Sequence, residues 1–297
     1  MTAVDVGLDL GGTKAAVLAV AEDGTTVVDA VVAADGWDAE PIDDGVRWVA
    51  DLLARTLPEG AVPRAVGIGA QGLDTPEIAA EFAAALGELG IRARCVNDAA
   101  LLVPAAGLEQ GIGLIAGTGA IGVSTDAAGR PLITGGWGWV IGDEAGAAGM
   151  VREATRAALL AHDDGEPDDG LLGALLGAFR VPDAERLARA VNDEPTMDNW
   201  GPAAPAVFAA ADAGSPLALA SVDAAADHLA RLVDQLVRRG AVGDVVVAAG
   251  SVIVNQPRLA DAVASRVGER HPGFRLQLLT DPPVVGALAI ARRLASA

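Results

Sequence analysis

The sequence predicts an α/β protein built from two related halves, and three observations support this prediction. Strand-like runs rich in valine and alanine alternate with helix-like runs near both ends of the chain. A second series of strand-like runs begins near residue 111, in an order similar to the series that begins at residue 3. Each series contains a glycine-rich turn between its first strands. The two halves are expected to flank a cleft, because ligands of α/β sheets bind beyond the carboxyl ends of the strands.

The first half is predicted to have the order β-β-β-α-β-α-β. Its strands are expected at about 3–9, 15–21, 26–34, 65–69 and 91–96, and its helices at about 42–57 and 75–89. The first three strands are separated by Gly-Gly and Asp-Gly turns, and the first helix shows apolar residues at helical spacing. This order differs from the simple βαβ alternation of a dinucleotide-binding domain.

The second half is predicted to contain a similar sheet with a helical insertion. Strands are expected at IGLIAG, IGVST, PLITGG, 244–248 and 274–278, and helices over most of 143–240, at 257–268 and at 284–295. An acidic loop is expected at 162–169, inside the insertion. We therefore expect an N-terminal α/β domain of residues 1–105, completed by the C-terminal helix at 284–297. A C-terminal α/β domain of residues 106–283 would carry the insertion.

Composition narrows the class of protein and its partners. The 297 residues include no run of about 20 apolar residues, and the N-terminus shows neither a basic region nor a cleavage site. A single cysteine, Cys95, argues against a disulfide framework or a multi-cysteine metal site. The formal net charge of −19 argues against a nucleic-acid partner, because binding phosphate strands requires clustered cations. We expect a cytoplasmic protein with no membrane partner.

The first glycine-rich turn runs from Asp9 to Lys14 and includes Gly11, Gly12 and Thr13. Two glycines place no Cβ in the way of a ligand, and backbone N–H groups in such a turn can converge on an anion. The threonine adds a hydroxyl donor, and Asp9 at the end of the strand could hold a hydrated Mg²⁺ through water. An ordinary hairpin turn is the alternative.

Two further loops repeat the pattern of glycine beside a hydroxyl. Gly117, Thr118 and Gly119 lie between two strands, and Gly250 and Ser251 follow the buried run VVVAA. Loops at the starts of two similar halves suggest a clamp that reaches a triphosphate from both sides. Two GxGxxG matches do not indicate a nicotinamide-binding domain: GTGAIG continues as a strand where a helix is required, and GIGAQG follows four earlier elements and lacks the ribose-binding acidic residue. A plain strand–turn–helix remains the alternative for the last loop.

Carboxylates supply candidate chemistry. Asp98 follows the strand RARCV, where it could accept a proton from a substrate hydroxyl, or simply cap a helix. The segment GGWGWVIGDE concentrates two of the five tryptophans among glycines. Trp137 could pack against the apolar face of a sugar, while Asp143 accepts hydrogen bonds from its hydroxyl groups. A tryptophan wedge with a helix cap is the alternative. The three histidines are interpreted as surface or structural residues.

The motifs DLGGTK, VNDAA, IAGTGAIG, GGWGWVIGDEAG and VVVAAGSV, in this order, resemble those of BadF/BadG-type kinases. Within that family the nearest likeness is to N-acetylglucosamine kinases, and it covers nearly the whole chain. The resemblance implies the actin-like, ribonuclease H-like ATPase fold, with ATP and Mg²⁺ as cofactors and a homodimer as the assembly. It implies Asp98 as the catalytic base and Asp9 as the Mg²⁺-associated residue.

The resemblance also implies binding roles. ATP would be bound by Gly11, Gly12, Thr13, Lys14, Gly117, Thr118, Gly119, Gly250 and Ser251. The acceptor would be bound by Asp35, Gln71, Asp98, Thr118, Gly136, Trp137 and Asp143. Asp35 stands where the family usually has asparagine, and Gln71 stands at a serine-like position. Both departures leave kinase chemistry intact but put the identity of the acceptor in doubt.

The expected function is phosphorylation of a small-molecule amino sugar, N-acetyl-D-glucosamine, at its 6-hydroxyl. Glucosamine, glucose or another amino sugar is the alternative acceptor. Relatives that activate radical dehydratases hold an iron–sulfur cluster with cysteines, which one Cys95 per chain cannot supply. Zinc-containing sugar kinases are disfavoured for the same reason. A non-catalytic sensor that binds sugar and nucleotide is the remaining alternative.

Overall fold

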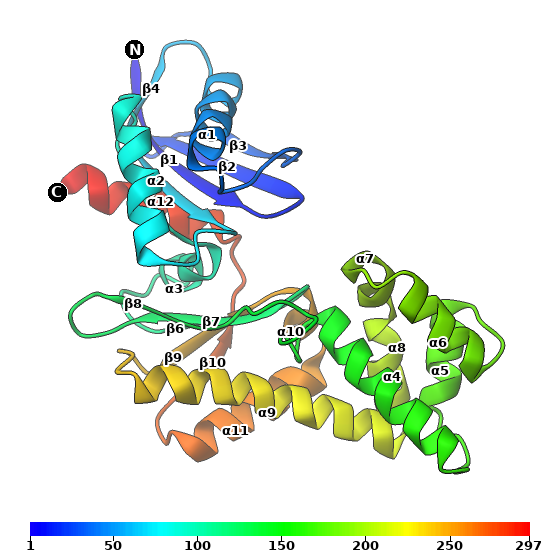
Figure 1. Cartoon of the computed structure of the whole chain (residues 1–297). Helices are drawn as coiled ribbons and strands as arrows, with labels where there is room; N and C mark the ends of the chain where they lie inside the picture. The colour runs from blue at the N-terminus through cyan, green and yellow to red at the C-terminus, as the bar shows by residue number, and fades with distance from the viewer. The chain divides into compact units, whose positions relative to one another are not determined.

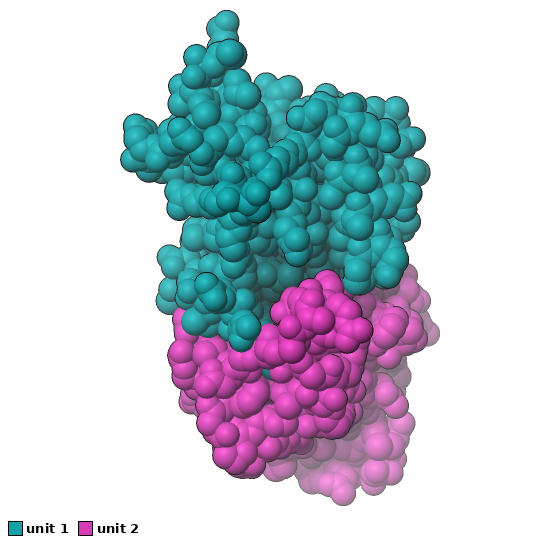
Figure 2. Space-filling model, turned by 90° about the vertical axis from the view of Figure 1, so that its left-hand side faces the viewer, with its two compact units in different colours: residues 1–113, 279–297 teal, residues 114–278 magenta.

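The computed structural model describes all 297 residues, which form two compact units. Unit 1 comprises residues 1–113 and 279–297, and unit 2 comprises residues 114–278 (Figure 2). Each unit is built around one five-stranded sheet, so the predicted α/β class is confirmed. No single helix is long and apolar enough to cross a membrane, although one sharply bent pair of helices, Met197–Asp212 with Pro216–Arg238, passes on length and composition.

The sheet of unit 1 has the order β3-β2-β1-β4-β5. Its strands are β1 (Thr2–Leu10), β2 (Lys14–Ala21), β3 (Thr26–Ala33), β4 (Ala61–Ala70) and β5 (Ala93–Asn97). Strands β1 to β3 form an antiparallel meander, whereas β4 and β5 run parallel to β1. Parallel strands end at the same edge of a sheet, so the residues that follow β1, β4 and β5 are neighbours.

Helices cover the sheet of unit 1 (Figure 1). They are α1 (Ile42–Thr56), α2 (Pro76–Glu88), α3 (Leu102–Ala105), which follows the 3₁₀ turn η1 (Asp98–Leu101), and α12 (Val284–Ser296). Alternate residues of β1, such as Leu8, join the core formed with Phe82 of α2. The residues between them meet α12, where Gly7 and Gly67 leave no room for a Cβ against the backbone of the helix. Glycine at these two positions lets α12 lie directly on the sheet.

The sheet of unit 2 has the order β10-β9-β6-β7-β8. Its strands are β6 (Ile112–Ala116), β7 (Ala120–Thr125), β8 (Pro131–Gly135), β9 (Val245–Ala249) and β10 (Arg275–Leu278). Its helices are α4 (Ala147–Asp163), α5 (Leu171–Phe179), α6 (Ala184–Asp193), α7 (Met197–Trp200), α8 (Ala204–Asp212), α9 (Pro216–Arg238), α10 (Ser251–Asn255) and α11 (Pro257–Arg270). Helices α5 to α8 gather beside α4, while α9 and α11 run along the sheet (Figure 1).

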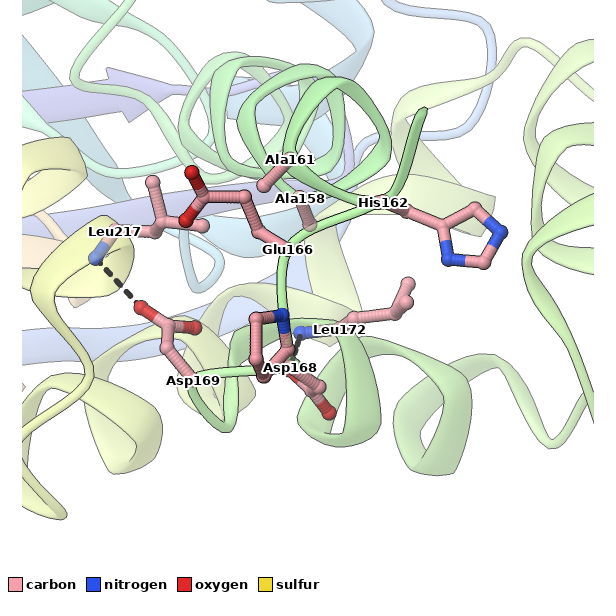
Figure 3. A pocket seen from close by; sticks show the side chains of 9 residues that line it. Ala158, Ala161, His162, Glu166, Asp168, Asp169, Leu172 and Leu217 are labelled. Atoms are coloured by element: carbon pink, nitrogen blue, oxygen red, sulfur yellow. Dashed lines mark hydrogen bonds between the residues drawn. The ribbon is translucent and has the colours of Figure 1, made fainter. Parts of the chain in front are cut away.

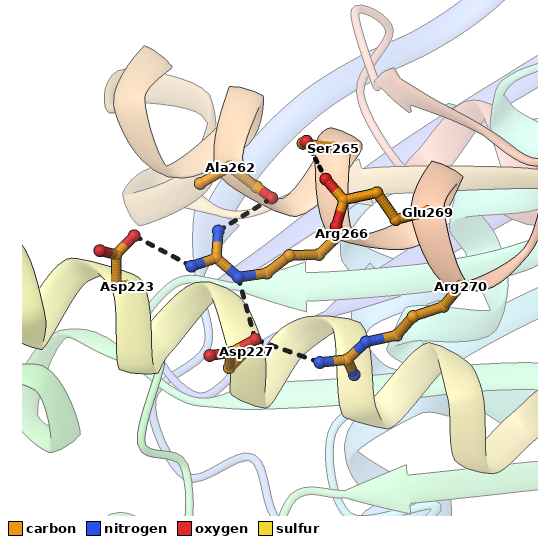
Figure 4. A network of polar contacts seen from close by, with 7 residues as sticks. All are labelled: Asp223, Asp227, Ala262, Ser265, Arg266, Glu269 and Arg270. Atoms are coloured by element: carbon orange, nitrogen blue, oxygen red, sulfur yellow. Dashed lines mark hydrogen bonds and ion pairs between the residues drawn. The ribbon is translucent and has the colours of Figure 1, made fainter.

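Polar contacts hold the helices of unit 2 together. Arg266 of α11 donates to Asp223 and Asp227 of α9, and Arg270 adds a second donor to Asp227 (Figure 4). In the loop before α5, the Asp169 carboxylate accepts hydrogen bonds from Ser215 and from the Leu217 N–H at the start of α9 (Figure 3). The small pocket above this carboxylate lies within the capping structure of the two helices.

The predicted elements agree closely with the structure. Every predicted strand and helix is present, with ends that differ by a few residues. The region predicted to be mostly helical, residues 143–240, resolves into five α-helices and the long helix α9. Two short helical regions, η1 with α3 from Asp98 and α10 after Gly250, were expected only under the alternative interpretations of these two loops. Both are too short to show a periodic apolar pattern.

Candidate functional site

The predicted site residues fall into two sets, one in each unit. In unit 1, the turn from Gly11 to Lys14 joins β1 to β2, and the Gly11 N–H donates to the Lys14 carbonyl at 3.0 Å. Gln71, directly after β4, lies beside this turn, since a Cβ on Gly12 would come 3.0 Å from the Gln71 Oε1. The strand register aligns Leu10 with Ala70 and Ala70 with Asn97. The first glycine turn, Gln71 and Asp98 therefore lie along one edge of the sheet.

Asp98 begins the 3₁₀ turn after β5, and its Oδ1 accepts the Ala99 N–H at 2.8 Å. The Asn97 Oδ1 accepts the same N–H at 2.9 Å, so Asn97 shares the capping role that the sequence offered to Asp98. Burial raises the pKa of Asp98, the Ala99 hydrogen bond opposes that shift, and the negative charge of Asp74 adds to it. A carboxyl with a raised pKa is a better proton acceptor when ionised, as a general base requires.

Asp9 and Asp98 influence each other across the edge of the sheet. Burial, followed by the negative charge of Asp98, raises the pKa of Asp9 to about 6. A divalent cation would stabilise the ionised form of such a carboxylate, so the residue fits the predicted Mg²⁺ role. The chain has no group of three or more acidic, histidine or cysteine side chains that could hold a metal ion. Magnesium at Asp9 would therefore keep water and nucleotide oxygens as most of its ligands.

Two residues of this set were not predicted from the sequence. The Asn97 side chain donates to the Asp74 carboxylate at 2.7 Å, which ties the loop after β4 to the start of the 3₁₀ turn. The adjacent Asn-Asp pair at 97–98 was the available signal.

Asp35 lies exposed in the loop after β3, and its carbonyl accepts the Trp48 indole N–H at 3.1 Å. That hydrogen bond anchors the loop to α1.

In unit 2 the other two glycine loops meet. A Cβ added to Gly117 would lie 3.4 Å from the Gly250 Cα, and Ser251 begins α10 directly beside it. The Gly117 N–H donates to the Gly119 carbonyl, and the Gly117 carbonyl accepts the Ala147 N–H at the start of α4. Thr118 at the tip is exposed. The turn at 117–119 and the loop at 250–251, both predicted to bind ATP, thus form one surface within this unit.

The tryptophan-rich loop between β8 and α4 presents the remaining candidates. Gly135, Gly136 and Gly138 have positive φ angles, which glycine adopts without strain. The loop exposes Trp137, whose side chain is 76% exposed. Asp143 is a non-glycine residue at φ 52°, and its Oδ1 is buried without a hydrogen-bond partner. Burial raises the pKa of Asp143. An exposed indole next to an unsatisfied carboxylate oxygen suits a polyhydroxylated ligand, which offers an apolar face and hydroxyl donors.

One histidine contacts this region, and no local sequence pattern predicted that contact. His228 of α9 is largely buried, and its Nδ1 lies 3.1 Å from the Glu144 carboxylate. His271 pairs with Asp234 at 3.3 Å instead, and His162 is exposed. The interpretation of the histidines as surface or structural residues agrees with the contacts of His162 and His271, whereas His228 contacts the residue next to Asp143.

Solved structures with similar folds include sugar kinases. A protein of Chromobacterium violaceum, provisionally assigned as an N-acetylglucosamine kinase, is 26% identical with a TM-score of 0.73, covering 96% of this chain and 98% of that one. A ROK family glucokinase of Streptomyces griseus, solved with glucose and AMPPNP, is 19% identical with a TM-score of 0.57 and covers 98% and 99%. The predicted actin-like sugar-kinase fold is thereby confirmed.

Two curated sequences are also similar. The N-acetyl-D-glucosamine kinase of Dictyostelium discoideum is 24% identical over 96% of this chain and 97% of its own length. The N-acetylmuramic acid/N-acetylglucosamine kinase of Clostridium acetobutylicum is 34% identical over 41% of each chain. The model of the BadF/BadG/BcrA/BcrD ATPase family matches residues 6–291, nearly the whole chain. The chain therefore belongs to the BadF/BadG/BcrA/BcrD ATPase family.

Proposed function

We propose that this protein transfers the γ-phosphoryl group of ATP to the 6-hydroxyl of N-acetyl-D-glucosamine. The chain is an ATP-dependent sugar kinase by its family and by relatives that match it along nearly their whole length. The choice of acceptor is our proposal, supported by two relatives named for N-acetylglucosamine. The homodimer expected from the resemblance is part of the same proposal.

The observation that carries the mechanism is the pair of mutually repelling carboxyls, Asp9 and Asp98, beside the first glycine turn. In this proposal Asp98 accepts the proton of the acceptor hydroxyl as the hydroxyl oxygen attacks the phosphoryl group. Asp9 would hold a hydrated Mg²⁺, which when bound would supply positive charge to neutralise the phosphates. Phosphoryl transfer requires little more than such positioning and charge neutralisation.

The nucleotide would be bound by backbone groups of the three glycine loops. Lys14, Thr13 and Thr118 would add side-chain donors to the phosphates, and Ser251 would lie toward the adenosine. An acidic chain with a net charge of −19 repels a free triphosphate, so local donors and Mg²⁺ are needed to hold it. In unit 2, Trp137 and Asp143 would contact the acceptor, together with Gly136 and Thr118. In unit 1, Asp35 and Gln71 would form hydrogen bonds with the hydroxyl groups of the acceptor.

Glucosamine, glucose or another amino sugar is the second candidate acceptor. The observation in its favour is the exposed Asp35, which as an ionised carboxylate accepts but cannot donate a hydrogen bond. An asparagine at this position would do both. The arrangement of acceptor hydroxyl groups that this loop binds can therefore differ from the arrangement that an asparagine would bind.

A coupled ADP-release assay over free sugars tests both candidates. We expect the highest kcat/KM for N-acetylglucosamine, with the 6-phosphate identified by NMR of the product. A higher kcat/KM for glucosamine or glucose would select the second candidate. ATP and sugar binding without any sugar phosphate would indicate a sensor instead of an enzyme.

Asp98→Asn tests the assignment of the base. The amide keeps the size of the side chain but cannot accept the proton, so we expect kcat to fall about 10²–10⁴-fold while ATP still binds. Asp126→Asn, a carboxylate held by Arg130 in a turn of unit 2, is the matched control and should leave kcat unchanged. Turnover retained in Asp98→Asn would remove Asp98 from the mechanism.

A further inference from the structure

The tryptophan-rich loop between β8 and α4 has a tip that is largely exposed. The Trp137, Val140 and Ile141 side chains are 76%, 68% and 81% exposed. Within the tip, the Gly142 N–H donates to the Gly138 carbonyl at 2.8 Å and closes a tight turn. A segment that buries few of its own apolar side chains is held by its other contacts or moves. The orientation of this tip therefore depends on contacts from other elements of unit 2.

The first of these contacts comes from Arg152, in the second turn of α4. Its Nη1 donates to the Trp139 carbonyl and lies 3.4 Å from the Gly142 carbonyl. Its Nε donates to Glu153 at 2.7 Å, and the side chain is only 16% exposed. A guanidinium presents its donors in a rigid planar fork, so the Glu153 contact also orients the donor that faces the loop. Arg152 thus ties the tip to the helix that follows it.

The second contact is made between aromatic rings. The ring centroids of Trp139 and Trp200 are 5.0 Å apart with planes inclined at 57°, within the range of favourable aromatic pairs. Trp200 ends α7, and its indole N–H donates to the Val191 carbonyl of α6 at 3.0 Å. The Asn199 side chain donates to the Ala190 carbonyl of the same helix at 2.9 Å. The helical insertion therefore holds Trp200 in place from its other side.

Both contacts converge on one residue of the loop. The carbonyl of Trp139 faces α4 and its ring faces α7, whereas Trp137 is open to solvent. Only Gly138, with φ 82°, separates the two tryptophans. A Cβ on Gly142 would lie 3.0 Å from the Trp137 Cβ, so Trp137 also lies against the closing end of the turn. A displacement of Trp139 would therefore displace Trp137.

We propose that Arg152 and Trp200 are positioning residues, which hold Trp139 and thereby fix the tryptophan-rich loop in the shape that presents Trp137 to the acceptor. The inference rests on the proposed function, because that function assigns Trp137 to the sugar. It gives the helical insertion a part in acceptor binding through side chains that lie behind the loop. Loss of either contact should weaken sugar binding and leave ATP binding unchanged.

Two substitutions of Trp200 test the ring contact. Trp200→Leu removes the ring that packs on Trp139, whereas Trp200→Phe keeps a ring there. We expect Trp200→Leu to raise the KM for N-acetylglucosamine about fivefold, as for the loss of an aromatic pair, with the KM for ATP within about twofold of wild type. Trp200→Phe should keep the sugar KM within about twofold of wild type, because the ring contact is retained.

A matched pair of substitutions in α4 tests the guanidinium. Burial raises the pKa of Asp143 and the charge of Arg152 opposes that shift, so Arg152→Lys is chosen because it keeps the positive charge. A lysine amine lacks the rigid fork that donates to Glu153 and to the loop together. Arg156→Lys is the control, because Arg156 pairs with Glu153 from a side chain that is 75% exposed. We expect the sugar KM to rise in Arg152→Lys and to stay unchanged in Arg156→Lys.

Hydrogen exchange measured by mass spectrometry reports on the loop without any turnover. Peptides that cover residues 136–142 should exchange faster in Trp200→Leu and Arg152→Lys than in wild type, and at the wild-type rate in Arg156→Lys. Unchanged exchange in the first two variants would overturn the proposal. So would an equal rise in the KM values for sugar and ATP in Trp200→Leu, or an equal sugar KM in the two lysine variants.

Two further results keep the test decisive. If Trp200→Leu does not fold, Trp139→Leu removes the same ring contact from the loop side, and it should show the same rise in sugar KM and the same faster exchange. A wild-type sugar KM in a folded Trp139→Leu would refute the ring contact. Wild-type protein that phosphorylates no sugar would defeat the proposed function, whereas the exchange of residues 136–142 would still decide whether Arg152 and Trp200 hold the loop.

Discussion

Gly250→Ala should be among the most damaging single changes in unit 2. Gly250 has φ 103° and ψ 147°, a conformation that only glycine adopts readily. A Cβ at this position would lie 2.5 Å from the Ala116 carbonyl oxygen and 2.8 Å from the Gly117 nitrogen. Both atoms are backbone, so no side chain can rotate away to make room.

The magnitude follows from two costs. The backbone strain is about 1–3 kcal/mol, and overpacking adds about 1–3 kcal/mol. We therefore expect the free energy of unfolding to fall by about 2–6 kcal/mol, a large share of the 5–15 kcal/mol typical of a folded protein. Relief of the clash would also displace Gly117, so the KM for ATP should rise.

Urea denaturation followed by circular dichroism measures the loss of stability. Gly268→Ala is the matched control, because a Cβ there has no neighbour within 4 Å and the residue lies in α11. Alanine in a helix should stabilise it by up to about 1 kcal/mol. If Gly250→Ala unfolds within about 0.5 kcal/mol of wild type and keeps its KM for ATP, the close packing of the two loops is refuted.

Three further predictions concern pH, ion pairs and the loop that carries Asp35. In metal-free protein, Asp9→Asn should raise stability by up to about 3 kcal/mol above pH 6 and by little near pH 4. The pKa of Asp9 is about 6 in the folded protein, above the unfolded value of about 3.9. The stability that this carboxyl contributes is therefore present below pH 4 and is lost as the pH rises to 6. A difference in melting temperature between Asp9→Asn and wild type that does not change with pH would contradict this. Arg266→Ala should lower the free energy of unfolding by about 1 kcal/mol, because its partner Asp227 is half exposed. The loss should be smaller in high salt, which screens the ion pair. A loss above about 3 kcal/mol in urea denaturation would contradict this prediction. Trp48→Phe removes the donor to the Asp35 carbonyl and should raise the sugar KM about fivefold, the equivalent of about 1 kcal/mol, without changing the KM for ATP.

The order of elements could be predicted from the sequence because it depends on local patterns. Valine-rich runs bounded by glycine turns predicted the strands. The contacts that position the site depend on residues far apart in the sequence. The approach of α12 to Gly7 and Gly67 gives no local signal, since a glycine in a strand predicts only a weak strand.

The side-chain partners were also beyond local patterns. The histidine at 228 lies in an unremarkable stretch of helix, and only the packing of α9 brings it to Glu144. The interpretation of Asp98 as either a helix cap or a base assumed a choice between them. The structure has Asn97 and Asp98 accept the same N–H, so the carboxylate keeps a second oxygen for other chemistry.

Trp137, exposed in the loop between β8 and α4, gives the protein an intrinsic fluorescence signal that can report on ligand binding. The chain has no tyrosine, so its ultraviolet emission comes from five tryptophans alone. Trp37, Trp48, Trp139 and Trp200 are partly shielded, each beside another aromatic ring, while Trp137 is open to solvent. A bound ligand that covers this indole would shift its emission to the blue and protect it from iodide. Sugar occupancy could then be followed without a label and before any turnover, with Trp137→Phe as the silent reference.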